Sequence, residues 1–288
     1  MNTASRTDRI FQVINYLILV VVMLVCLLPF LNILAKSFSN ETSVLAGDIS
    51  FWPTGFNLKA YNVVFGSYRF WDALFVSIFI TVAGTAINTL LTIFASYSLS
   101  RTRLKFRRFF TFLYIFTMLF NGGIIPTYLV IRHVGLINSV WSLIIPTLVM
   151  PFNMIILRNY FYNVPDSLEE SAKMDGALNV RILFSIMIPL AMPAVATIML
   201  FYAVGYWNNY FEALMYINNR KLFPLQIYLR ELILNTDTNK MNMSSLMHIA
   251  QESVRGATII AATLPILAVY PFLQKYFVKG VMLGSVKQ

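Results

Sequence analysis

The chain has 288 residues, of which 58% are hydrophobic and only 12% are charged. Soluble globular domains carry about 25% charged residues, so this composition excludes an ordinary soluble domain and indicates an integral membrane protein. The formal net charge of +10 favours contact with anionic membrane lipids, and we expect no nucleic-acid partner. Cys26 is the single cysteine, which excludes an intramolecular disulfide.

Six windows of the sequence are long and apolar enough to cross a bilayer, and none contains Asp, Glu, Lys or Arg. A transmembrane helix needs about 20 apolar residues, and a charge within it costs about 2.5–3.5 kcal/mol. The windows are approximately 11–34, 73–99, 109–131, 140–157, 182–210 and 257–273. We therefore predict an all-α integral membrane protein with six transmembrane helices in a single membrane domain, 1–288.

The basic residues predict the orientation of these helices. With the N-terminus inside, the cytoplasmic pieces hold 13 of the 22 lysines and arginines. These pieces are 1–10, 100–108, 158–181 and the tail after Leu273. Short cytoplasmic loops are enriched in basic residues, so we expect both termini and segment 158–181 to be cytoplasmic. The first apolar run is longer than that of a signal peptide, which favours an uncleaved membrane anchor.

Polar and helix-breaking residues mark the second and third spans. Ala83, Gly84 and Ala86 predict a face that packs closely within a bundle. Asn88 beside them makes either an interhelical hydrogen bond or part of a polar pathway. The cluster 121–126, Asn-Gly-Gly-Ile-Ile-Pro, breaks the third span. Irregular backbone at such depth is tolerated only inside protein or beside a wet cavity, so a translocation path and an ordinary kink both fit.

Segment 165–177 interrupts the apolar half of the chain with a short polar helix. Ser167 and Glu170 have the spacing of a capping box, and acids in the first turn favour the helix dipole. Gly176 predicts a left-handed stop. So short a helix is marginal in isolation, so we expect it to rest on its own membrane helices or on a partner.

The fifth span is predicted to be bent and to end in a polar aromatic cluster. Asn179 can cap its start, and Pro189 and Pro193 remove backbone hydrogen bonds about one turn apart. Its end combines amides with rings, in Trp207, Asn208, Asn209 and Tyr210. Such groups suit either a sugar site or an aromatic membrane belt. The following segment, 213–256, is predicted to be a long external loop.

The residues of segment 170–177, followed by Ile188, Pro189 and Leu190, resemble the EAA loop of ABC importer permeases. Ser171 stands where that loop often has alanine. Phe-Trp-Pro at 51–53, Trp207-Asn208 and the ending 279–287 resemble the maltose-type, binding-protein-dependent branch that takes up carbohydrates. Segments 121–128, 135–138 and 166–170 are similar to a subgroup linked with complex, often acidic oligosaccharides of pectin or alginate type.

This resemblance implies a type I ABC importer permease fold and a non-catalytic subunit in the bacterial cytoplasmic membrane. The implied partners are a second, homologous permease subunit in a heterodimer, two copies of an ABC ATPase, and an extracytoplasmic solute-binding protein or lipoprotein. ATP and magnesium would bind the ATPase, and no cofactor or metal would bind this chain. The ATPase-coupling residues of the family map onto Glu170, Ala172, Asp175, Gly176 and Ala177. By position, 235–240 would probe the binding protein, and the tail near Lys287 and Gln288 would reach the ATPase.

Two other classes of function fit the residues less well. An ion-coupled secondary transporter would need ionisable residues within the membrane, and the six windows have none. A membrane enzyme is disfavoured because His133 and His248 are the only histidines and show no metal-binding spacing. The chain has no phosphate-binding loop, so ATP would be handled elsewhere. The candidate substrate path comprises Asn88, Asn121, Trp207, Asn208, Asn209 and Tyr210. External basic residues such as Arg220, Lys221 and Arg230 suit an anionic sugar or simple loop solvation.

Overall fold

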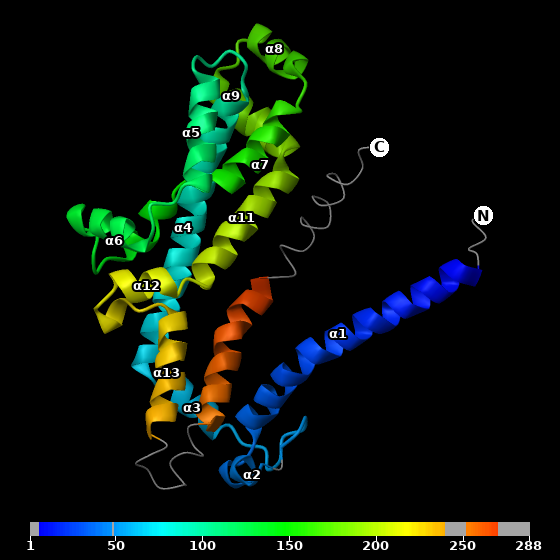
Figure 1. Cartoon of the computed structure of the whole chain (residues 1–288), viewed down its shortest axis with the longest axis vertical. Coiled ribbons are helices and arrows are strands. Elements are labelled where there is room, and N and C mark those ends of the chain that lie inside the picture. Colours follow the sequence, from blue (N-terminus) through cyan, green and yellow to red (C-terminus); the bar gives the residue numbers. More distant parts are fainter. Residues whose placement is uncertain (1–5, 48, 240–251, 270–288) are drawn as a thin grey trace. The chain divides into compact units, whose positions relative to one another are not determined.

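The computed structural model describes residues 6–47, 49–239 and 252–269, and all regular secondary structure in them is helical (Figure 1). This confirms the predicted all-α class. The chain forms two compact units, 1–70 with 229–265 and 71–228 with 266–288, which are described separately. Within the described residues, three helices are long and apolar enough to cross a membrane, or up to six if each of three bent helix pairs is one span.

The first unit contains a long helix with a small packed region at its C-terminal end. Helix α1 (Arg6–Phe38) includes Pro29, and its residues from Ile10 to Phe30 are all exposed. Near its end, the Ser37 hydroxyl hydrogen-bonds the Tyr61 hydroxyl at 2.9 Å. A Cβ at Gly256 would lie 3.1 Å from the Ile33 carbonyl oxygen, so the helix Glu252–Val269 approaches α1 closely. The unit also contains α2 (Glu41–Ala46) and α3 (Lys59–Phe65).

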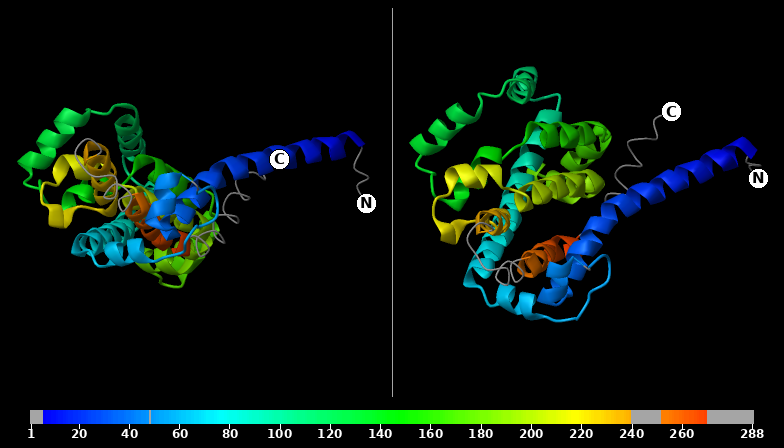
Figure 2. Two further views of the ribbon diagram at one scale, coloured as in Figure 1. Left: turned by 90° about the horizontal axis from the view of Figure 1, so that it is seen from below. Right: turned by 60° about the horizontal axis from the view of Figure 1, so that its bottom comes forward.

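The second unit is built around helix α4 (Tyr68–Ser100). Its membrane-type segments are bent pairs: α5 (Arg107–Leu119) with α6 (Ile124–His133), the 3-10 helices η1 (Val140–Leu143) and η2 (Ile145–Thr147) with α7 (Pro151–Tyr162), and segment 179–190 with α11 (Met192–Trp207). The bends are 116°, 46° and 86°, respectively. Figure 2 shows α6 turned away from α5. The third, fourth and fifth predicted windows are therefore interrupted helices.

The bends occur where the sequence removes helical hydrogen bonds. Gly123, at φ 89°, precedes α6, and its N–H donates to the Asn121 side-chain oxygen at 2.8 Å. The second bend ends at Pro151, the first residue of α7. Ala191 separates the two halves of the fifth window, between Pro189 and Pro193. The predicted break at 121–126 and the predicted bend of the fifth span are thus confirmed.

A ladder of buried polar side chains fastens α4 to its neighbours. Asn88 Nδ2 donates to the Thr147 carbonyl at 2.7 Å and also to the Tyr206 hydroxyl. Thr92 hydrogen-bonds the Tyr202 hydroxyl at 2.8 Å, and Ser96 donates to the Met154 carbonyl at 3.0 Å. Positions 88, 92 and 96 lie on one helix face, and all three side chains are buried. Such bonds hold helices together in lipid, where burying apolar surface gains little.

Gly84 permits the close approach of α4 to α11. A Cβ at this position would lie 2.6 Å from the Tyr206 ring, so the glycine is required by contact. The predicted packing face is confirmed at Gly84, whereas the assignment of Ala86 to it is wrong, because Ala86 is exposed. Residue 86 lies about 200° around the helix from residue 84, on its opposite side.

Replacing Gly84 with alanine is expected to lower the melting temperature of the assembled complex, measured after purification in lipid nanodiscs. Overpacking costs about 1–3 kcal/mol, since the added methyl displaces the Tyr206 ring and its hydrogen bonds. Gly205→Ala is the matched control, because a Cβ there meets nothing within 4 Å. That variant should be neutral or slightly stabilising, as Ala replaces Gly in a helix. Equal stability of both variants would contradict the packing argument.

The chain after Tyr210 is more helical than predicted. It forms α12 (Phe211–Tyr216), the 3-10 helix η4 (Arg220–Leu222) and α13 (Leu225–Asn239). The prediction of a loop over this part of 213–256 is wrong, because Leu225 and Ile227 are buried and begin an apolar helix face. Residues 235–239 end α13, whereas Lys240, His248, Lys287 and Gln288 lie outside the described residues.

Candidate functional site

The candidate site is helix α8 (Asp166–Met174), which stands at one end of the second unit, beyond α5 and α9 (Figure 1). The predicted capping box is wrong, because α8 begins at Asp166 after Pro165 and no side chain caps that end. Pro165 has φ −57° and ψ 132°, which starts the helix before Ser167, so the Ser167 hydroxyl falls within the first turn. The predicted cap at Asn179 is also wrong, since Leu178 precedes α9 (Asn179–Ile182) and Asn179 is already helical.

The C-terminal end of α8 is closed as predicted. Gly176 has φ 78°, in the left-handed region that favours glycine. Its N–H donates to the Lys173 carbonyl at 3.0 Å, and the Ala177 N–H donates to the Ala172 carbonyl at 2.9 Å. This pair of bonds is a Schellman motif, in which residues at the two ends of the turn also make apolar contact. The helix therefore ends sharply, and the chain continues into α9.

Glu169 is turned into the protein and carries the charge that seats α8. Only 4% of this residue is exposed. Arg101 Nη1 lies 2.9 Å from Glu169 Oε2, and Lys173 Nζ lies 2.5 Å from Oε1. The Arg101 contact is an ion pair and not a hydrogen bond, because Oε2 has no aligned donor in the part of the chain that the structure describes. We call Arg101, Glu169 and Lys173 the Arg101 clamp.

Arg101 connects the clamp to the rest of the second unit. It follows α4 directly, and its Nη2 donates to the Phe161 carbonyl of α7 at 3.3 Å. Its Nη1 also donates to Asp166 Oδ1 at 3.3 Å, and its guanidinium lies 5.0 Å from the centre of the Tyr97 ring. One side chain therefore joins the ends of α4 and α7 to α8. Separating the partners of such an ion pair would leave a buried charge unpaired, so the pair favours the arrangement in which α8 stays in place.

The predicted coupling residues divide between the two sides of α8. Glu170, Asp175 and Gly176 are exposed. Ala172 and Ala177 are half-buried and pack on an apolar cluster of the second unit. The buried members of that cluster are Ile93, Tyr97, Leu157, Phe161, Ile182, Leu183, Met187, Ala191, Ala194, Val195 and Ile198. The two alanines thus seat the helix, and the exposed residues form a surface that a second protein can touch.

Two large apolar side chains extend this exposed surface. Met174 is 88% exposed and Leu178 is 78% exposed, next to the carboxylates of Glu170 and Asp175. Exposed apolar groups rimmed by polar ones are typical of protein–protein interaction sites. We call Glu170, Met174, Asp175 and Leu178 the free face of α8.

The segment after α8 leads directly into the bent fifth window. It consists of α9, a π-helix η3 (Leu183–Met187), α10 (Ile188–Leu190) and then α11. π-helical turns are rare and occur frequently at functional sites. Leu183 and Met187 of this turn are buried in the same apolar cluster as Ala172 and Ala177. Residues of α8 and η3 thus pack on one apolar cluster, and only a short connection separates the two helices along the chain.

The candidate substrate residues lie in different environments. Asn88 is fully buried and makes the interhelical bonds described above. Trp207 is buried, whereas Asn208 and Asn121 are exposed. Asn209 accepts a hydrogen bond from the Ala213 N–H at 3.3 Å, at the start of α12. Tyr210 is half-buried and packs against an apolar cluster of the second unit. The structure brings Asn88 next to the Trp207 segment through Tyr206, and the role of these residues in a substrate path stays a prediction.

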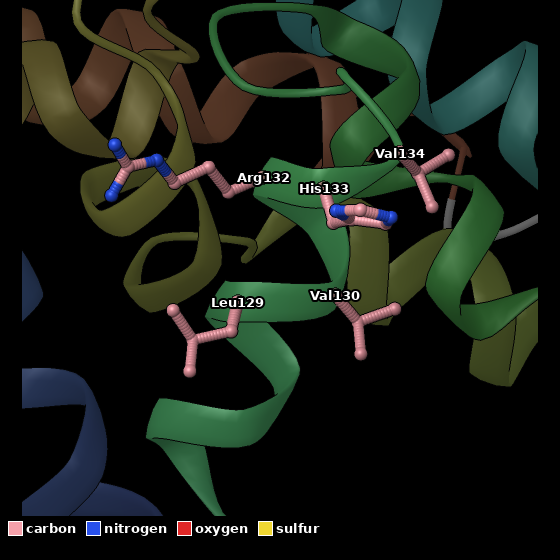
Figure 3. Close-up of a pocket in the computed structure, with 5 residues that line it drawn as sticks. All are labelled: Leu129, Val130, Arg132, His133 and Val134. Atoms are coloured by element: carbon pink, nitrogen blue, oxygen red, sulfur yellow. The ribbon is translucent and has the colours of Figure 1, made fainter.

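A pocket of about 700 Å³ lies along α6 (Figure 3). It is lined by Leu129, Val130, Arg132, His133 and Val134, so none of the predicted path residues lines it. In the described part of the chain, no group of three or more His, Cys, Asp or Glu residues could hold a metal ion.

The Arg101 clamp was not predicted from the sequence. In the sequence, Arg101 is one of the basic residues of loop 100–108, and Glu169 is one of the acids near the start of the polar helix, within the segment 166–170. The i,i+4 spacing of Glu169 and Lys173 is visible in the sequence and is a signal for one half of the clamp. The other half is the contact of Arg101 with α8, which joins residues far apart in the sequence. Arg101 and Asp166, which also pair, are 65 residues apart.

Comparison with known proteins identifies the family. Residues 1–283 match the model for "Binding-protein-dependent transport system inner membrane component". The chain is 44% identical to the polygalacturonan/rhamnogalacturonan transport system permease protein YtcP of Bacillus subtilis over 283 residues, covering 97% of this chain and 99% of that protein. It is also 44% identical to protein LplC of the same organism over 285 residues, covering 98% and 97%.

A solved structure agrees with these matches. It is the crystal structure of a bacterial ABC transporter involved in the import of the acidic polysaccharide alginate. Its matching chain superposes with a TM-score of 0.87 at 36% identity, covering 96% of this chain and 100% of that one. The fold, the family match and the permease relatives lead to one conclusion: the chain belongs to the inner membrane component family of binding-protein-dependent transport systems and is an ABC importer permease subunit.

Proposed function

We propose that this chain is one permease subunit of an ATP-driven importer for acidic oligosaccharides, and that α8 couples it to an ABC ATPase. The observation that carries the coupling role is the arrangement of α8. The Arg101 clamp and Ala172 hold one side of the helix, while the other side presents the exposed Glu170 and Met174. A lever between two proteins needs both a fixed side and a free side.

The positions of η4, α13 and α8 relative to the two ends of α4 support the proposed orientation. The Leu225 N–H donates to the Ser77 hydroxyl at 2.7 Å, which places the start of α13 near one end of α4, whereas the clamp lies at the other end. The helix from Ser77 to Ser100 is about 35 Å long at 1.5 Å per residue. That length matches a hydrocarbon core of about 30 Å. We propose that α8 and both chain termini are cytoplasmic and that η4 is external.

The proposed assembly follows the family description of a binding-protein-dependent system. This chain would pair with a second, homologous permease, and two ATPase subunits would bind ATP and magnesium. An extracytoplasmic binding protein would deliver the sugar to the side that carries η4. This chain would contribute no cofactor or catalytic group of its own.

The substrate class rests on the relatives and on charge. The similar permease YtcP is named for polygalacturonan and rhamnogalacturonan, and the similar solved transporter for alginate, which are acidic polymers. Arg220 and Lys221 are exposed on η4, where they add positive potential on the proposed substrate-entry side. Such a potential would attract an anionic oligosaccharide or its loaded binding protein.

The test is ATPase activity of the complex, co-purified with its genomic neighbours and reconstituted in lipid. The binding protein is loaded either with oligogalacturonate or with a neutral oligosaccharide of equal length. We expect stimulation of several-fold by the acidic form alone. Stimulation by the neutral form alone would overturn the substrate class. Failure of any ATPase to co-purify, with uptake driven by an ion gradient, would overturn the importer and favour a secondary transporter.

A further inference from the structure

A second pocket, of about 780 Å³, lies between the start of α5 and α7 and has no role in the coupling described above. One end of it is basic, with the side chains of Arg107, Arg108 and Arg158. The other end is apolar, with Phe112 and Ile115 on the next turns of α5. All of these residues belong to the second unit.

The basic end has positive charge without a counterion in the described part of the chain. No carboxylate there pairs with the three arginines, although Arg101 in the same loop pairs with both Asp166 and Glu169. Arg107 and Arg158 line one pocket and repel each other. The start of helix α5 adds further positive potential, because the helix begins at Arg107 with no acidic residue in its first turn and no side-chain cap. The positive end of a helix dipole disfavours cations and favours anions, so a bound anion would stabilise the basic end of this pocket.

The side chains of Arg107 and Arg158 are each held by a contact that leaves their Nη donor groups available. Arg158 Nε donates to the Leu99 carbonyl at 3.0 Å. The Arg107 guanidinium lies 5.2 Å from the centre of the Tyr162 ring. Within the described residues, no hydrogen bond or ion pair uses the Nη groups of Arg107 or Arg158. Guanidinium groups fixed in this way match the oxygens of a phosphate.

The apolar end identifies the kind of molecule that would carry this phosphate. Helix α5 has no buried residue in the structure, and Phe112 is 63% exposed. The helix rises about 10 Å from Arg108 to Ile115, so it offers an apolar track that starts at the arginines. A free phosphate or a protein carboxylate would use only the basic end. A phospholipid would use both, with its phosphate among the arginines and its acyl chain along α5.

We propose that this pocket binds an anionic phospholipid of the cytoplasmic leaflet through Arg107, Arg108 and Arg158. The proposal rests on the orientation given under the proposed function. It does not depend on the transported sugar or on coupling to ATP, so it can fail while the importer stands. The bound lipid neutralises the start of α5 and fastens the loop that also carries Arg101.

The test uses the complete complex, purified and then reconstituted in nanodiscs that contain phosphatidylcholine with 10% of a photoactivatable, tail-labelled phosphatidylglycerol. We expect the label to attach to α5 peptides containing Phe112 or Ile115. The variant Arg107→Gln/Arg108→Gln should lose about tenfold or more of that labelling. Removing cations from the start of a helix does not destabilise it, so this loss would not reflect misfolding.

The matched control is Arg103→Gln/Lys105→Gln, which removes two charges from the same loop but from residues that do not line the pocket. It should label like the wild type. Equal labelling of α5 in both double variants, or labelling spread evenly over the exposed apolar helices, would overturn the proposal. Displacement of the lipid by millimolar inorganic phosphate would reassign the site to free phosphate. Attachment of a crosslinker at Phe112 to a neighbouring subunit, with no lipid labelling, would reassign it to a protein contact.

Discussion

Replacing Arg101 with methionine is expected to lower ATP-driven uptake by about tenfold or more. Glu169 is buried, and this change leaves Lys173 as the only cationic partner of its carboxylate among the described residues. Removing one partner of a buried ion pair costs about 3–5 kcal/mol, and the remaining lysine places the effect at the lower end of that range. Because of this cost, the variant favours states in which α8 is released from the ends of α4 and α7 and Glu169 reaches water. A lever that is no longer seated transmits motion poorly.

Uptake of labelled oligosaccharide into proteoliposomes is the measurement, with complex assembly followed by co-purification. Arg103→Met is the matched control, because it removes an exposed arginine of the same loop and should retain uptake. Asp166→Asn should also retain uptake, since the Asp166 side chain is 70% exposed and such ion pairs contribute about 0–1 kcal/mol. Uptake by Arg101→Met within twofold of the wild type would disprove a seating role for the clamp.

Replacing Glu170 with alanine is expected to uncouple ATP hydrolysis from uptake without lowering the stability of the chain. Glu170 lies on the free face of α8, and in the described part of the chain its carboxylate makes no ion pair. We expect it to accept a charge-assisted contact from the ATPase subunit. Contacts of that kind contribute about 1.5–3 kcal/mol, which corresponds to a loss of roughly ten- to hundredfold in coupled transport.

ATPase rate and uptake are measured in parallel on the same proteoliposomes, so that their ratio reports coupling. Ser167→Ala serves as the control for helix capping, because Ser167 caps nothing in the structure and its loss should be neutral. If Ser167→Ala reproduced the defect, the role of Glu170 would lie in helix formation. Wild-type uptake by Glu170→Ala would remove Glu170 from the coupling surface altogether.

These two predictions separate adjacent residues that look alike in the sequence. Glu169 and Glu170 are both acids near the start of a polar helix. Successive residues on a helix point about 100° apart, so only one of them can face the protein when the helix lies on a surface. The contacts of Arg101 and Lys173 show that Glu169 is that residue. The resemblance to the EAA loop identified Glu170 as a coupling residue and gave Glu169 no such role.

Much of the architecture could be predicted from the sequence because its causes are local. A bilayer requires long apolar segments, so the windows were visible from composition. Proline and glycine act on their own backbone, which explains why the bends near Asn121 and Pro189 and the stop at Gly176 were predicted correctly. The predicted caps at Ser167 and Asn179 failed even though they are also local. Helix α8 begins at Asp166, one residue before Ser167, and α9 begins at Asn179 itself, so both side chains already lie inside the helix that they were predicted to cap.

The sequence by itself determined the membrane class, the breaks in the helices and the position of a short polar helix with its own stop. Only the tertiary structure decided which side of that helix is fixed and which is free. It also decided that Asn88 faces Tyr206 and that Gly84 must be glycine. The reason is physical: apolar length and backbone freedom are properties of neighbouring residues. Ion pairs and close contacts arise between residues such as Arg101 and Glu169, which meet only after the chain has folded.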